Sequence, residues 1–211
     1  MTQLPQSQCG TVAILASGPS LAAEDVDFVR GKATVIAVND AVELAPWADV
    51  LYSSDPGWWQ KHKWMRDFAG VRVMVDPVRS HKPLKPPVED HGVLVLRQTG
   101  KDGIEFSPDG LRTAINSGGA AINLAVHMGA KRIVLLGYDM GRLHGRSHFH
   151  DTGPTPSYSA YDVFIRLIGT MAAPLAEAGI AVVNCSRLSA LKCFPRMPLA
   201  EALPARMAVA S

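Results

Sequence analysis

The run Val12–Leu21, VAILASGPSL, constrains the fold most, because it has the pattern of a buried strand, a tight turn and a helix start. Its apolar residues do not alternate with polar ones, which is typical of a central parallel strand covered on both faces. Gly18 and Pro19 then end the strand, and Ser20 is a candidate N-cap. A helix that begins here has amide groups without intrahelical partners. We therefore expect an anion-binding turn at this position; the alternative is a turn whose glycine and proline serve geometry alone.

Apolar runs of strand length recur along the chain and alternate with helical patterns. The predicted strands after the first are Ala33–Val38, Asp49–Ser53, Val71–Val75, Val93–Leu96, Lys131–Gly137 and Ile180–Val183. Amphipathic spacing predicts helices that begin after Ser20 and that cover Trp58–Phe68, Asn116–Met128 and Ser157–Ala178. Pro174 is expected to kink or shorten the last helix. This alternation predicts an α/β fold with a single doubly wound, mostly parallel sheet and helices on both faces, of Rossmann-like type.

Composition limits the class of protein and of partner. A chain of 211 residues with 47% hydrophobic content can bury one substantial core, so we expect residues 1–211 to form a single domain with an irregular tail from about residue 186. The net charge of +2 indicates neither nucleic acid nor a membrane surface as partner. No apolar stretch reaches the length of a membrane span, and no signal-peptide pattern opens the chain.

The cysteines point to a reducing compartment. Cys9, Cys185 and Cys193 are widely spaced, odd in number and without a C-x-x-C pair, so neither a disulfide framework nor a zinc knuckle is indicated. Together with the lack of a membrane segment, this pattern predicts a cytoplasmic protein. A homo-oligomer remains open at this stage.

Polar residues follow the ends of several predicted strands, where a doubly wound sheet binds its ligands. Asn39 and Asp40 follow the second strand, and Asn39 has the alternative role of capping the next helix. Asp55 follows the third strand. Tyr138 and Asp139 follow the strand at Lys131–Gly137. Asp139 is a candidate for binding ribose, a metal or a catalytic proton, with a turn residue as the alternative.

A second glycine-containing helix start is the other candidate ligand contact. Asn116 or Ser117 is suited to cap this helix, and the small residues from Gly118 onward allow close approach of a ligand or of the sheet. Neither helix start carries G-x-G-x-x-G or G-x-x-x-x-G-K-[ST], so neither a dinucleotide dehydrogenase nor a P-loop kinase is indicated.

Histidines cluster in the segment LHGRSHFHD, which contains His144, His148, His150 and Asp151. A zinc site and exposed loop histidines are two alternatives. We favour a general base at His148 or His150, because an unperturbed imidazole titrates near neutral pH.

Two segments have both a functional and a structural interpretation. Trp58–Phe68 interleaves aromatic and basic residues, which suits either base stacking with phosphate contacts or an amphipathic helix with its aromatics buried. The proline-rich segment Asp76–His91 suits a lid, a partner surface or a solvated connection.

Four longer segments add a family resemblance that spans most of the chain in order. They are ASGPSL (Ala16–Leu21), VIAVND (Val35–Asp40), NSGGAAINLAVHMGAKRIVLLGYD (Asn116–Asp139) and NCSRLSALKCF (Asn184–Phe194). They resemble glycosyltransferase family 42, the bacterial sialyltransferases that use CMP-sialic acid. They equally resemble the archaeal 6-hydroxymethylpterin pyrophosphokinase group and its small phage-borne relatives.

The sialyltransferase resemblance implies roles for particular residues. The Gly-Pro-Ser turn and the following asparagine line the family's nucleotide pocket, as does the Ser-Gly helix start, and a histidine ahead of the long helix acts as general base. Those positions here are Ser17, Gly18, Pro19, Ser20, Asn39, Ser117, Gly118 and either His148 or His150. The family's lid tyrosines have no counterpart in the short connection between Asp139 and His148.

The sequence therefore predicts a nucleotide-binding domain that acts as a nucleotide-dependent transferase. In the first version a glycosyl group passes from a nucleotide-sugar donor to an acceptor, with a histidine base and no required cofactor. In the second version pyrophosphate passes from ATP, which requires Mg²⁺ with Asp139 as a ligand. The third alternative is a nucleotide-binding or assembly protein without turnover.

Overall fold

Eight parallel strands form one sheet in the order β6-β5-β4-β3-β2-β1-β7-β8. The computed structural model describes residues 3–7, 9–76, 91–108, 110–150 and 157–203. The strands are β1 (Thr11–Leu15), β2 (Thr34–Val38), β3 (Val50–Tyr52), β4 (Val71–Val75), β5 (Leu94–Gly100), β6 (Gly110–Arg112), β7 (Arg132–Leu136) and β8 (Ala181–Asn184). Strand order reverses beside β1, which pairs with β2 on one side and with β7 on the other. The crevice outside the carboxyl ends of β1 and β7 is therefore the topological switch point, where such sheets bind ligands.

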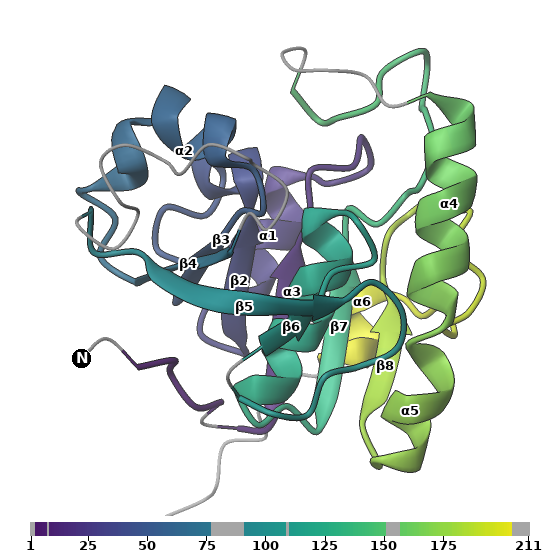
Figure 1. Ribbon diagram of the computed structural model, residues 1–211. Helices are drawn as coiled ribbons and strands as arrows, with labels where there is room; N and C mark the ends of the chain where they lie inside the picture. Colours follow the sequence, from purple (N-terminus) through teal and green to yellow (C-terminus); the bar gives the residue numbers. More distant parts are fainter. Residues whose placement is uncertain (1–2, 8, 77–90, 109, 151–156, 204–211) are drawn as a thin grey trace, which may run out of the picture.

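Helices cover both faces of this sheet, as predicted (Figure 1). One face packs against α3 (Ser117–His127), α4 (Tyr158–Gly169) and α5 (Ala172–Glu177). The other face packs against α1 (Ala23–Val29), the 3₁₀ helix η1 (Asn39–Glu43), α2 (Pro56–Lys61), the 3₁₀ helix η2 (Lys63–Met65) and α6 (Leu199–Ala202). Neighbouring residues of β1 such as Ile14 and Leu15 are both fully buried, one in each core, which explains why the strand shows no polar alternation.

The long helix predicted over Ser157–Ala178 is two helices, because Pro174 disrupts it one turn upstream. Proline has no amide to donate to the carbonyl four residues before it, and its ring crowds that carbonyl. The break falls at Thr170 and Met171, between α4 and α5. The Thr170 and Met171 amides donate instead to the carbonyls of Leu167 and Ile168, three residues back.

The polar region after the fifth strand contains structure that the sequence did not predict. β5 continues to Gly100, and β6 adds an edge strand beside it. Asn123, a fully buried residue of α3, fixes β6 and the connection that precedes it. Its Oδ1 accepts hydrogen bonds from the Glu105 amide (2.8 Å) and the Arg112 amide (3.1 Å), and its Nδ2 donates to the Glu105 carbonyl (2.8 Å).

The aromatic residues of Trp58–Phe68 are buried, as the interpretation of this segment as an amphipathic stretch predicted. The side chains of Trp58, Trp59 and Trp64 are 8%, 0% and 8% exposed and belong to the core beneath α2 and η2. Trp64 has a positive φ of 63°, so the chain forms two short helices here instead of one. The proline-rich segment lies almost entirely outside the described residues.

The chain beyond Ser186 has little regular structure but packs closely. Within its described part, 187–203, α6 is the one helix, and Leu191 and Phe194 are 0% and 5% exposed. The Asn184 amide donates to the Pro195 carbonyl, and Asn184 pairs with Arg196 in a parallel bridge, which extends the sheet edge beside β8.

Two glycines allow the turns after β1 and β7 to meet at the switch point. A Cβ on Gly18 would lie 2.2 Å from both the Gly137 carbonyl oxygen and Asp139 Oδ2. A Cβ on Gly137, which has a φ of +70°, would lie 2.2 Å from the Ala16 carbonyl oxygen. Glycine is therefore required at position 18 because the two turns approach so closely. Its backbone conformation does not require glycine, since the φ of Gly18 is not positive.

Substituting Gly18 tests this packing. We expect Gly18→Ala to lower the free energy of unfolding by roughly 1–3 kcal/mol, since backbone atoms must shift to admit the methyl group. For a chain of this size that corresponds to a fall in Tm of about 2–4 °C per kcal/mol, measurable by calorimetry. Gly169→Ala is the matched control: its Cβ would meet nothing within 4 Å, at the end of α4, and it should leave stability equal or slightly higher. Equal Tm values for both variants would contradict the argument.

Candidate functional site

Most of the predicted site residues lie along one edge of the sheet, at the carboxyl ends of β1, β2, β3 and β7. Three contacts join the segments that carry them. The Phe149 amide donates to the Ser17 carbonyl (3.1 Å), which brings the histidine loop to the end of β1. The Ser54 amide donates to Ser117 Oγ (3.1 Å), and the Tyr138 hydroxyl donates to the Gly118 carbonyl (2.9 Å), which fixes the start of α3 at the same edge.

The expected anion-binding turn after β1 is already occupied by the protein itself. The Ser20 amide donates to Asp139 Oδ2 (3.0 Å), the Gly18 amide to the Gly137 carbonyl (3.0 Å) and the Leu21 amide to the Gly18 carbonyl (3.1 Å). The prediction that Ser20 caps a helix was wrong. Pro19 and Ser20 form a turn, and α1 begins only at Ala23 without a side-chain cap.

Asp139 is a buried carboxylate with a structural contact. Asp139 is 6% exposed, and this burial raises the pKa of its carboxyl group. Hydrogen bonding to Ser20 and the charge of Arg196 partly oppose the rise. Its Oδ1 has no hydrogen-bond partner in the described part of the chain. The described residues contain no group of three or more His, Cys, Asp or Glu side chains placed to hold a metal ion. Asp139 therefore belongs to no such group among the described residues.

Tyr138 is held by the segment after β8. Its side chain is fully buried, and burial raises its pKa above the ordinary range. Its amide donates to Ser186 Oγ (2.7 Å), and Ser189 Oγ donates to its carbonyl (2.6 Å). The side chain, amide and carbonyl of Tyr138 are therefore all used in contacts within the fold.

Two predicted ligand contacts serve as helix caps. Asp55 Oδ1 accepts from the Gly57 amide (2.8 Å) at the start of α2, and Asn116 Oδ1 accepts from the Gly119 amide (2.8 Å) at the start of α3. The cap at Asn116 confirms one of the two residues predicted for that role. Capping of this kind stabilises a helix by about 1 kcal/mol.

The start of α3 and Asn39 remain available for a ligand. The amides of Ser117 and Gly118 lie in the first helical turn, where no intrahelical acceptor exists, and no acceptor for them is found among the described residues. Asn39 begins η1 with a φ of 53°, a left-handed conformation that asparagine tolerates. Its Oδ1 is buried without a hydrogen-bond partner in the part of the chain that the structure describes.

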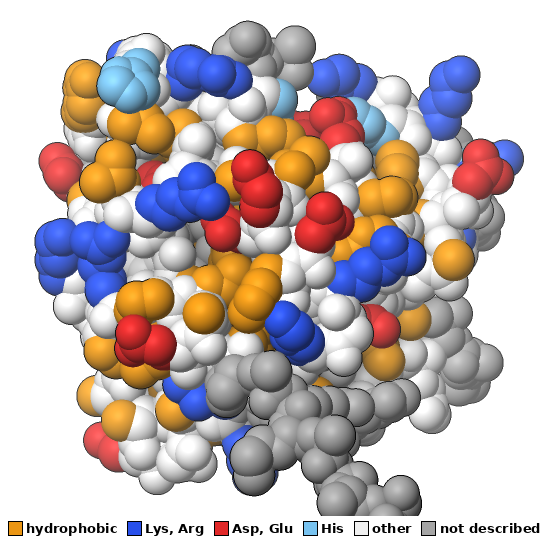
Figure 2. All heavy atoms as spheres, turned by 180° about the vertical axis from the view of Figure 1, so that it is seen from behind, with side chains coloured by type: hydrophobic (Ala, Val, Ile, Leu, Met, Phe, Trp, Pro, Cys, Tyr) orange, Lys and Arg blue, Asp and Glu red, His pale blue; other side chains and the backbone are white. Residues whose placement is uncertain are grey.

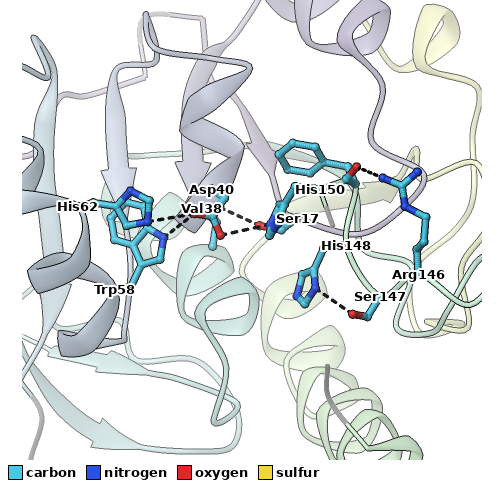
Figure 3. Close-up of polar contacts among 10 residues, drawn as sticks. Ser17, Val38, Asp40, Trp58, His62, Arg146, Ser147, His148 and His150 are labelled. Carbon is cyan, nitrogen blue, oxygen red and sulfur yellow. Dashed lines mark hydrogen bonds and ion pairs between the residues drawn. The ribbon is translucent and has the colours of Figure 1, made fainter. Parts of the chain in front are cut away.

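Asp40 is the centre of a cluster that the sequence did not reveal (Figure 3). Its Oδ1 accepts from Trp58 Nε1 (2.9 Å) and lies 3.3 Å from His62 Nε2. Its Oδ2 lies 3.2 Å from His150 Nε2. Figure 3 shows the carboxylate between the two imidazoles, one from the end of α2 and one from the histidine loop. His62 is separated from Asp40 by 22 residues and from His150 by 88, so no local motif could have indicated the contact.

His148 lies beside this cluster. Its ring stacks on that of His150 with a centroid distance of 5.1 Å, and its Nδ1 is 2.9 Å from Ser147 Oγ. Burial lowers the pKa of His148, the neighbouring His150 lowers it further, and the charge of Asp40 opposes both. His148 therefore stays neutral at neutral pH, as a proton acceptor must. His144 is exposed, and Asp151 lies outside the described residues.

The face opposite that of Figure 1 carries mixed charge. Figure 2 shows Lys and Arg side chains interspersed there with Asp and Glu, without one continuous basic patch. No helix within the described ranges combines the length and apolar character that crossing a membrane requires.

No protein-family model, curated protein or solved structure matches the chain.

The burial of Asp139 gives a pH-dependent prediction. Its pKa is higher in the folded than in the unfolded chain, so folding is increasingly disfavoured as pH rises from 3.8 through the folded pKa. We expect Asp139→Asn, which keeps an oxygen acceptor for the Ser20 amide, to be more stable than wild type at pH 7 and to lose that advantage near pH 4. Each unit of the pKa difference corresponds to about 1.4 kcal/mol.

Urea denaturation at several pH values measures this effect. Asp27→Asn, at an exposed position of α1, is the control and should show no such trend. A destabilised Asp139→Asn with the same deficit at every pH would show that the carboxylate charge itself stabilises the fold.

Proposed function

We propose that the protein is a nucleotide-dependent transferase in which His148 is the general base, with glycosyl transfer from a nucleotide-sugar donor as its reaction. The observation that carries the proposal is a half-buried imidazole at the switch-point edge of the sheet, where burial lowers its pKa. His148 is attached there through Phe149 to Ser17, at the end of β1. For Nε2 to receive the acceptor proton, Nδ1 must carry the ring proton and donate it to Ser147 Oγ, which lies 2.9 Å away.

The start of α3 supports binding of the donor phosphates. The amides of Ser117 and Gly118 are donors at the positive end of an 11-residue helix, which is the usual protein environment for a phosphate. This differs from the turn at Gly18 and Ser20, whose amides are used internally. Asn39, with its unpartnered amide oxygen, supplies a polar contact for the nucleoside. No observation specifically favours the pyrophosphokinase alternative.

Nucleotide binding is the first test. We expect a panel of CMP, UDP, GDP and ATP, with their sugar conjugates, to raise Tm for at least one nucleotide. Ligand at 100 times its Kd adds about 2.7 kcal/mol of stability. Gly118→Val should abolish the shift, because a side chain there faces Tyr138 Cε1 at 3.1 Å and crowds the phosphate position. Gly169→Ala serves as the control. No shift with any nucleotide, with and without Mg²⁺, would refute the proposal.

Replacing the base is the second test. We expect His148→Ala to lower kcat about 100-fold to 10,000-fold, the usual contribution of one general base, with little change in donor binding. His144→Ala, an exposed histidine of the same loop, should have wild-type activity. Because the base acts unprotonated and its pKa is lowered from 6.5, wild-type activity should fall only below about pH 6.5. Unchanged turnover in His148→Ala would remove this mechanism.

A further inference from the structure

The loop that carries His148 is fixed on both sides of this residue. Leu143 and Arg146 form an antiparallel bridge, with amide-to-carbonyl distances of 2.9 and 3.0 Å. Arg146 Nη2 donates to the Phe149 carbonyl (2.6 Å), and the Phe149 amide donates to the Ser17 carbonyl (3.1 Å). Because the backbone is held in this way, the state of the His148 ring depends on the contacts of its side chain.

The contacts of the His148 ring leave its Nε2 atom open. The ring of His150 stacks on it with a centroid distance of 5.1 Å, and Ser147 Oγ lies 2.9 Å from Nδ1 (Figure 3). Nε2 has no hydrogen-bond partner in the described part of the chain and is not among the buried unpartnered atoms there. The two nitrogens therefore differ: Nδ1 is used by the fold, and Nε2 can reach a substrate.

The contact between Ser147 and His148 permits two directions of hydrogen bonding. A serine hydroxyl both donates and accepts, and either imidazole nitrogen can carry the ring proton. If Ser147 donates to Nδ1, the ring proton is on Nε2, and Nε2 cannot accept another. If Nδ1–H donates to Ser147 Oγ, Nε2 is a free acceptor. The direction of this one bond therefore decides whether His148 can act as a base at its open nitrogen.

Tyr161 of α4 is a second partner of Ser147. Tyr161 and Ser147 are 8% and 9% exposed, and the Tyr161 ring packs edge-on against Phe164. Burial raises the pKa of Tyr161, and a hydrogen bond with the Ser147 side chain is among the smaller effects that lower it, as a donor at the phenol oxygen does. Ser147 has one hydroxyl hydrogen. When that hydrogen points to Tyr161, the Ser147 oxygen faces Nδ1 as an acceptor, and Nδ1 must carry the ring proton.

We propose that Ser147 and Tyr161 are positioning residues of the transferase site, joined to His148 in a hydrogen-bonded chain whose donors all point from Nδ1 toward α4. The inference rests on the proposed function. In the reaction, the acceptor oxygen bonds to the sugar carbon, and the bond from that carbon to the donor phosphate breaks with its electron pair on the phosphate oxygen. The acceptor proton passes to His148 Nε2 and later to solvent, while Nδ1–H remains hydrogen-bonded to Ser147 Oγ.

Nitrogen-15 NMR of the histidine side chains tests this chain without any turnover. At a pH above the pKa of His148, we expect wild type to carry the ring proton on Nδ1. Ser147→Ala removes the acceptor and Tyr161→Phe removes the atom that orients it, so both should move the proton wholly or partly to Nε2. Tyr158→Phe, at a tyrosine of α4 that is 67% exposed, is the control and should leave His148 unchanged. A wild-type ring with its proton on Nε2 would overturn the inference.

Turnover separates positioning from a purely structural role. We expect Ser147→Ala and Tyr161→Phe each to lower kcat about 10-fold, the effect of losing one neutral hydrogen bond, with KM for the donor unchanged. Ser147→Thr keeps the hydroxyl and should regain part of the lost rate, and Tyr158→Phe should have wild-type kinetics. Wild-type kcat in Ser147→Ala would show that this hydrogen bond has no role in the reaction.

The two experiments distinguish failure of this inference from failure of the proposed function. A ring proton that is on Nδ1 in wild type and moves in both variants upholds the chain, and a complete lack of nucleotide-sugar turnover beside that result refutes the proposed function alone. Turnover by a wild-type protein whose His148 proton is on Nε2 would instead overturn the chain and leave the transferase activity standing.

Discussion

The close contact of the turns after β1 and β7 is the constraint on which the rest of the structure depends. Gly18 and Gly137 bring two backbones together, and the Ser20 amide then reaches the Asp139 carboxylate at 3.0 Å. This contact closes the switch point from one side. It also explains why a turn with the composition of an anion site needs no external anion, since the chain supplies its own.

Because that corner is closed, the polar groups at this edge that remain available to a ligand lie near β2 and α3. Asn39 and Asp40 follow β2 directly, and the first amides of α3 lie across the same edge beside Ser54. The histidine loop crosses to meet them through the Phe149–Ser17 hydrogen bond. A nucleotide placed there would have helix amides at its phosphates and imidazoles on the side toward β1. This arrangement differs from a site built on the Gly-Pro-Ser turn.

Local sequence patterns predicted the elements well and the site only in part. The runs Val71–Val75 and Asn116–Met128 correspond closely to β4 and α3, because burial and helix capping act over a few residues. β6 escaped notice because three residues, held by the distant Asn123, carry no periodicity of their own. The α1 start was misplaced because a serine after proline matches a cap equally well in a turn.

The Asp40 cluster shows a different limit of sequence analysis. His62 was interpreted as part of a basic aromatic segment, and Asp40 as one of two polar residues at a strand end. Their contact depends on how α2 packs against η1 through Trp58, which only the folded chain determines. His148 and His150 were predicted as base candidates from residue type, but the burial that lowers the pKa of His148 comes from the fold.

Strand order also determines when the site can form during folding. β1 pairs with β7, so Thr11 meets Arg132 across more than half of the chain, and this pair lies inside the sheet between β2 and β8. Contacts so far apart in sequence make folding slow. On the ribosome, β1 can therefore pair with β7 only after most of the polypeptide has emerged. The strands β1 to β5 can assemble earlier as a parallel sheet, and the outer edge of β1 then stays unpaired until β7 is available.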